Sequence, residues 1–173
     1  MGRAYGVPII WTASIFITSL MGSGLAFADS LSNKTITYKS GGLTGGAFSV
    51  YVGSTGNVCE TNISGDPSAQ GIRYKLGKTT EETTTFTDVL GSKLTCSVNG
   101  TATLSGNILR LKSNYHCNNG NFDHGVTIQI NGTNCSVQRN ERNQGLPFGN
   151  SDTSSTCEVT SGNQLGPTKW LQQ

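Results

Sequence analysis

Between Ser92 and Arg139 the chain alternates apolar and polar residues in four short segments, joined by loops that are rich in Asn and Gly. A period of two is the pattern of a β-strand that has one face against a core and the other in water. Thr, Ser and the 23 glycines are abundant, and no window of the sequence offers a convincing amphipathic helix. We therefore expect an all-β fold in which this stretch forms an antiparallel meander.

The first hairpin of the meander is predicted from the side chains that must face inward. A two-residue turn at Asn99-Gly100 would place the apolar residues after it on the wrong face. A three-residue loop over 99–101 instead sets Val98 opposite Ala102 and Cys96 opposite Leu104. We therefore expect a hairpin with a three-residue loop at this point.

The rest of the meander follows the same alternation. A turn at 106–107 leads into a strand over 108–117, whose predicted inward face is Leu109, Leu111, Tyr115 and Cys117. In the last hairpin, a four-residue loop over 131–134 sets Ile130 opposite Cys135.

Outside the meander, further strands are expected at 34–39, 48–52, 71–77, 83–90 and 156–160, and a four-residue loop over 53–56 sets Cys59 opposite Val50. Residues 140–155 show no periodicity, which indicates a long loop. The prediction is one β-rich domain over 29–173, an antiparallel sandwich or small barrel of about nine or ten strands.

Residues 1–28 have the organisation of a secretory signal peptide. Arg3 supplies a positive start, residues 7–20 are largely apolar, and Ala26-Phe27-Ala28 forms an Ala-x-Ala cleavage site. An uncleaved membrane anchor is the competing interpretation, but Ser, Thr and Gly interrupt the apolar run. We expect a periplasmic or secreted protein.

The charge balance of the chain argues against two classes of partner. Without residues 1–28, which hold the basic Arg3, 11 basic and 10 acidic residues remain and no basic run occurs. Nucleic acid and anionic membrane surfaces are therefore not expected as partners after signal cleavage. An unknown protein or a glycan remains as the expected partner.

All five cysteines are disulfide candidates: Cys59, Cys96, Cys117, Cys135 and Cys157. Export favours disulfides, and an odd number leaves one thiol free or paired between chains. The spacings 96–117 and 135–157 hint at two equivalent units. The predicted hairpin, however, carries Cys117 well beyond the strand of Cys96, so the sequence leaves the pairing open.

The two histidines suggest two kinds of chemistry. His116, Cys117, Asp123 and His124 are close in sequence, and such side chains can bind a metal. Alternatively, His124, Asp123 and His116 could serve a secreted hydrolase. Adjacent strand residues point to opposite faces, however, which favours His116 in solvent and Cys117 in a disulfide. No catalytic residue, metal site or cofactor is therefore assigned.

Aromatic residues among Asn and Thr suggest a third possibility. Tyr51, Tyr115 or Trp170 could stack on sugars in a carbohydrate-binding module, although packing against the core is the commoner role. We expect a non-enzymatic binding or structural β-domain, with a hydrolase or a carbohydrate-binding module as alternatives.

The signal peptide, the early strand, the segment 49–58 and the segment 130–138 (Ile-Asn-Gly-Thr-Asn-Cys-Ser-Val-Gln) together show a resemblance. The combination resembles small exported proteins of soil alphaproteobacteria that have no assigned function. This resemblance implies a Gram-negative periplasm or secretion and nothing about chemistry.

Overall fold

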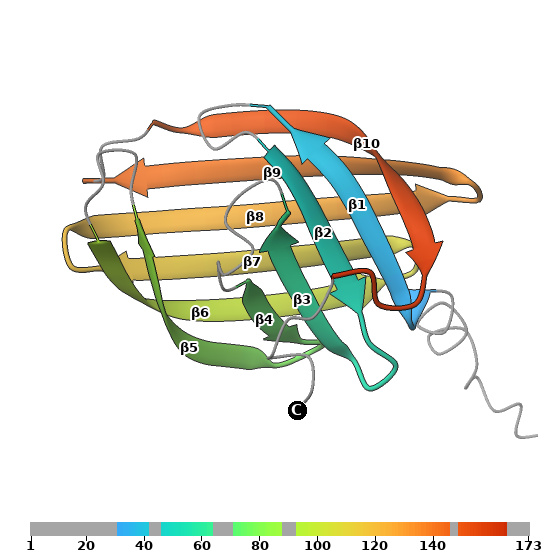
Figure 1. The fold of residues 1–173 in the computed structure, drawn as a ribbon, viewed down its shortest axis with the longest axis horizontal. Helices are drawn as coiled ribbons and strands as arrows, with labels where there is room; N and C mark the ends of the chain where they lie inside the picture. The colour runs from blue at the N-terminus through green and yellow to red at the C-terminus, as the bar shows by residue number, and fades with distance from the viewer. Residues whose placement is uncertain (1–30, 42–45, 64–70, 88–92, 146–148, 166–173) are drawn as a thin grey trace, which may run out of the picture.

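The computed structural model describes residues 31–41, 46–63, 71–87, 93–145 and 149–165. Every element in the described residues is a β-strand (Figure 1). The strands are β1 (Lys34–Ser40), β2 (Gly46–Val52), β3 (Asn57–Asn62), β4 (Ile72–Lys75), β5 (Thr79–Thr87), β6 (Lys93–Ser105), β7 (Ile108–Cys117), β8 (Gly120–Asn131), β9 (Asn134–Gln144) and β10 (Ser151–Ser161). The predicted all-β fold is confirmed.

The ten strands form one antiparallel sheet in the order β4-β3-β2-β1-β10-β9-β8-β7-β6-β5. Every strand pairs with the next one along the chain except β4, which has no ladder to β5. The pairing of β1 with β10 joins the two ends of the chain, so the gap between β4 and β5 is the one opening in the sheet of the described residues. The sheet curls into a nearly closed barrel, in which β1 to β4 cross β6 to β9 at a steep angle (Figure 1). The structure thus selects the barrel of the two predicted architectures.

Side chains bridge the open seam between β4 and β5. The carboxylate of Glu82 accepts a hydrogen bond from the backbone N–H of Arg73 at 3.0 Å, and the Thr80 hydroxyl donates to the Arg73 carbonyl at 2.8 Å. These two side chains satisfy the backbone groups that a neighbouring strand would otherwise pair. The unpaired edge of a strand can associate with other chains, and these side-chain hydrogen bonds reduce that tendency.

The barrel interior holds an apolar core made by the strand alternation. Ile36, Val50, Leu109 and Ile128 are all fully buried. The predicted inward face of β7 is confirmed, and Ile130 pairs with Cys135 as expected. A second, smaller cluster gathers Leu94, Cys96, Val98 and Tyr115.

The predicted hairpin at 99–101 is wrong, because β6 runs without interruption from Lys93 to Ser105. The alternate residues from Leu94 to Ala102 all face inward, so the same alternation continues through Gly100 and no turn is needed. Gly100 leaves room for an aromatic ring, since a Cβ there would lie 3.0 Å from Cδ1 of Tyr74.

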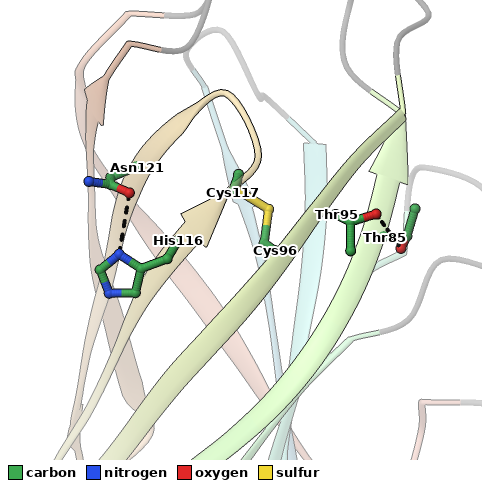
Figure 2. Close-up of a disulfide and its surroundings, with 6 residues drawn as sticks. All are labelled: Thr85, Thr95, Cys96, His116, Cys117 and Asn121. Atoms are coloured by element: carbon green, nitrogen blue, oxygen red, sulfur yellow. Dashed lines mark hydrogen bonds between the residues drawn. A yellow bond between two sulfur atoms is a disulfide. The ribbon is translucent and has the colours of Figure 1, made fainter.

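Two disulfides cross-link neighbouring strands of the sheet. Figure 2 shows Cys96–Cys117 between β6 and β7, and Cys135–Cys157 links β9 to β10. Cys96 and Cys117 are directly paired across the ladder, so the sequence objection to this bridge disappears with the predicted hairpin. Two bridges in one small domain are typical of an oxidising, extracellular compartment.

Cys59 is the free cysteine, and its predicted position was wrong. It pairs with Tyr51, while Glu60 pairs with Val50. A slip of one residue exchanges the two faces of a strand, so Cys59 lies on the outer face and Glu60 on the inner one. The Cys59 side chain is nevertheless buried. Burial raises the pKa of the Cys59 thiol to about 12, although the positive charge of Arg73 acts to lower it.

The predicted long loop at 140–155 is also wrong, because β9 continues to Gln144 and β10 begins at Ser151. The inward positions of this hairpin carry polar residues, so the sequence shows no alternation of apolar and polar residues there. The strand predicted at 83–90 begins earlier, at Thr79. The predicted signal peptide at 1–28 and Trp170 lie outside the described residues.

Candidate ligand-binding site

A buried pair of hydrogen-bonded side chains joins β3 to β8 across the barrel. The imidazole Nε2 of His124 lies 2.9 Å from Oε2 and 3.1 Å from Oε1 of Glu60. Each of the two residues is only 5% exposed. Inward-facing positions on opposite walls of the barrel thus bring together two residues that are 64 positions apart in sequence.

Two tyrosines add hydrogen bonds to the same carboxylate. Tyr38 donates to Oε1 of Glu60 at 2.9 Å, and Tyr74 donates to Oε2 at 3.2 Å. The Tyr74 hydroxyl also lies 2.7 Å from that of Ser113, which extends the network to β7. Burial raises the pKa of both tyrosines well above the ordinary value, so they stay protonated donors.

The environment keeps Glu60 ionised. Burial alone would raise its pKa, but the charge of His124 and its hydrogen bond, with help from Arg139 and Tyr38, outweigh burial and lower the pKa to about 2. Hydrogen bonds to a carboxylate and a nearby positive charge both favour its charged form. Glu60 is therefore a fixed negative charge inside the barrel at neutral pH.

A second buried pair lies on β9. Nη2 of Arg139 is 2.6 Å from Oε1 of Glu141, and both side chains are almost fully buried. The guanidinium of Arg139 stacks over the ring of Phe48, with Cζ 4.1 Å from the ring centroid. Cation–π contact and ion pairing together hold this arginine in place.

A cavity of about 150 Å³ adjoins these groups. Its polar lining includes Glu60, His124 and Arg139, and its aromatic lining comprises Phe48, Tyr115 and Phe122. Tyr115 and Phe122 pack against each other with ring centroids 5.1 Å apart. A pocket with aromatic walls and a few convergent polar groups is the usual form of a small-molecule binding site.

Nδ1 of His124 is one of the buried polar atoms in the described part of the chain that make no hydrogen bond. Nε2 of His124 is used by Glu60, whereas Nδ1 is buried without a hydrogen bond. Burying a polar atom unsatisfied costs about 1–3 kcal/mol.

The sequence candidates for metal binding or hydrolysis do not converge. His124 faces inward, whereas Asp123 is exposed and bonded to Asn114 on the outer surface. His116 is exposed beside Asn121, and Cys117 is in its disulfide (Figure 2). Within the described ranges, no group of three or more His, Cys, Asp or Glu side chains is placed to hold a metal ion.

Of the aromatic candidates, Tyr115 is buried in the barrel and lines the cavity, whereas Tyr51 is half-buried on the outer face. The two residues therefore do not form one aromatic surface for a sugar.

Two charged residues of the site, Glu60 and Arg139, were missed by the sequence reasoning. The missed signal was the continuing alternation, since Arg139 and Glu141 follow Cys135 and Val137 at inward positions. Glu60 likewise follows Val58. Polar residues at inward positions were interpreted as surface or loop residues because a core is normally apolar.

No family model, curated protein or solved structure matches this chain. None of the described residues form a helix that is long and apolar enough to cross a membrane.

Proposed function

We propose that this chain is an exported, non-enzymatic β-domain that binds a small molecule in the cavity beside Glu60 and His124. The observation that carries the proposal is the joint lining of one cavity by buried charged groups and aromatic rings. Export is supported by the signal-like segment 1–28 and by the two disulfides. The destination is the periplasm or the medium.

The buried polar cluster favours binding over a purely structural role. A buried ion pair is often no more stabilising than apolar side chains of the same size, because both charges lose their hydration. This barrel nevertheless places the ion pair Arg139–Glu141 and the hydrogen-bonded pair His124–Glu60 among its inward-facing residues. A perturbed carboxylate next to a cavity is a recognised mark of a functional site.

The binding part is tested by titrating ¹⁵N-labelled protein with four single-ring compounds: phenol, toluene, benzoate and benzylammonium. We expect saturable shifts of the amides around Glu60, His124 and Arg139 with at least one of them. Asn62 lines the cavity near the end of β3, and Asn62→Phe should block the response. Gln129→Phe, on the outer face of β8, is the matched control. If none of the four compounds shifts these amides, the binding proposal is wrong.

Export is tested separately by mass spectrometry of the chain expressed with its own first 28 residues in a Gram-negative host. The expected product begins at Asp29 and is recovered from the periplasm or the medium. Recovery of the intact chain from the cytoplasm would contradict export.

A further inference from the structure

We infer that the barrel carries a second binding site on the outer face of β2, β3 and β4, and that this site binds an acidic saccharide. It is separate from the cavity beside Glu60 and His124, so each proposal is tested on its own. Three features lead to the inference: a depression in the outer face, an aromatic ring in its lining, and two positive side chains that can bind a carboxylate.

The depression follows from the register of three strands that lie side by side in the sheet (Figure 1). Tyr51, Cys59 and Arg73 are direct neighbours across β2, β3 and β4, on the outer face. Strands lie about 4.8 Å apart, so the backbones of Tyr51 and Arg73 are roughly 10 Å apart with only the small side chain of Cys59 between them. Gly53, after β2, adds no side chain. The resulting depression of about 380 Å³ is lined by all four residues.

Tyr51 contributes an aromatic ring to this lining. The side chain is half-buried, and its hydroxyl donates to Oδ1 of Asn33 at 3.0 Å, which holds the ring in place. An aromatic ring packs against the apolar C–H groups of a sugar ring. The exposed residues Ser54, Thr55 and Asn57 also line the depression, and their hydroxyl and amide groups can exchange hydrogen bonds with sugar hydroxyls. One ring among many polar groups fits a polyhydroxylated ligand better than a hydrocarbon.

Lys75 and Arg73 make the depression positive. Nζ of Lys75 donates to the Thr55 carbonyl and to Oδ1 of Asn57, each at 2.8 Å, and an ammonium group has a third N–H to offer. Arg73 uses its Nε for Glu82. Its side chain is 49% exposed, so the terminal amino groups of the guanidinium can reach a ligand. None of the described residues that line the depression is Asp or Glu. Arginine and lysine donors of this kind recognise carboxylates.

A uronic acid unit of a saccharide combines the two requirements. It has a ring with apolar C–H groups for Tyr51, hydroxyls for the polar lining, and a carboxylate for Lys75 or Arg73. A neutral sugar lacks the charged group, and an inorganic anion lacks the ring. We therefore assign the site to an acidic saccharide.

The test titrates ¹⁵N-labelled protein with two acidic trisaccharides, trigalacturonate and trimannuronate, and with their neutral counterparts, galactotriose and mannotriose. We expect at least one acidic compound to shift the amides of residues 51–59 and 73–80 saturably. It should bind at least about tenfold more tightly than its neutral counterpart, which makes no charge-assisted hydrogen bond. If neither acidic compound shifts these amides, or if a neutral one binds as tightly, the inference is wrong. Binding of benzoate here with equal affinity would also contradict a saccharide site.

Paired variants separate the contribution of the ring from that of the charge. Tyr51→Leu should weaken binding of the acidic trisaccharide by about fivefold or more, whereas Tyr51→Phe, which keeps the ring, should stay within about threefold of the wild type. Lys75→Gln should weaken binding by about tenfold. Lys112→Gln removes an exposed positive charge from β7 and should change the affinity by less than about twofold. Equal losses within either pair would contradict the assigned contacts.

A measurement on the wild-type protein tests the charged contact without any substitution. The affinity for the acidic trisaccharide should fall when NaCl rises from about 0.05 M to about 0.5 M, because salt screens exposed charges. The affinity for the neutral counterpart should hardly change. An acidic trisaccharide whose affinity is independent of salt would contradict a contact with Lys75 or Arg73 and overturn the inference.

Discussion

Nε2 of His124 lies 2.9 Å from Oε2 of Glu60, which joins β8 to β3 through the interior of the barrel. The pair turns one part of the barrel interior from an apolar core into a charged, hydrogen-bonded cluster beside a cavity. The contact makes the stability of the fold depend on the charge of Glu60.

The first prediction concerns acid. The pKa of Glu60 is lowered to about 2 in the fold, against about 4.3 in an unfolded chain. Its stabilising effect is therefore complete above the unfolded pKa and is lost as the pH falls from about 4 to about 2. We expect this loss to be on the order of 3 kcal/mol in the free energy of unfolding, measured by urea denaturation across that range.

Glu60→Gln isolates this effect from that of the other carboxyl groups. At pH 7 the variant should be less stable than the wild type by roughly 3–5 kcal/mol, because it leaves the buried partners of Glu60 without a counter-charge. The deficit should shrink as the pH falls toward about 2. Glu158→Gln, at an exposed position, is the control. A deficit that is constant from pH 7 to 2 would contradict an ionised Glu60.

The second prediction separates a buried tyrosine hydroxyl from an exposed one. Tyr74→Phe removes the group that contacts both Glu60 and Ser113, and it should lower the free energy of unfolding by about 1.5–3 kcal/mol. Tyr51→Phe removes an exposed hydrogen bond to Asn33 and should cost less than about 1 kcal/mol. Chemical denaturation of both variants provides the comparison, and equal losses would argue against the interior network.

The third prediction concerns the cysteines. Cys59 is buried, and burial raises its pKa to about 12, so iodoacetamide should leave it unmodified in the folded protein at pH 8. In denaturant, without a reductant, Cys59 alone should react. Peptide mapping should then recover Cys96–Cys117 and Cys135–Cys157. Rapid alkylation of the native protein, or any other pairing, would contradict this structure.

The fourth prediction tests the close approach of β6 to Tyr74. Gly100→Ala would place a Cβ 2.9 Å from the Thr80 hydroxyl and 3.0 Å from the Tyr74 ring. We expect a loss of about 1–3 kcal/mol in the free energy of unfolding, typical of an overpacked interior. Ser97→Ala, on the exposed face of the same strand, should change stability by less than about 0.5 kcal/mol. If Gly100→Ala leaves the free energy of unfolding unchanged, the ring of Tyr74 can move aside.

The sequence predicts the fold class well because the apolar alternation is local. Ile128 and Ile130 face Val137 and Cys135 in the expected register, since a hairpin loop of known length fixes the pairing on both sides. Gly100 was misassigned because Asn-Gly is a strong turn signal. The glycine instead makes room for Tyr74, which comes from a distant strand, and no local pattern reports such a contact.

The candidate site could be predicted only in part. His124 was recognised as a residue of interest, but its partner Glu60 lies 64 positions away and meets it only when the sheet closes. A one-residue slip in the register of β3 had placed Glu60 outside. Arg139 was missed because its polarity resembles that of a surface, although its position, like that of Glu141, continues the inward alternation of β9.

The central claim is that the charged part of the barrel interior is a binding site, and a crystal structure of the protein soaked in phenol tests it most directly. The account predicts phenol in the cavity that Glu60, His124 and Arg139 line, with its ring against Phe48 or Phe122. A cavity that holds no phenol at saturating concentration, or phenol bound only elsewhere, would contradict it.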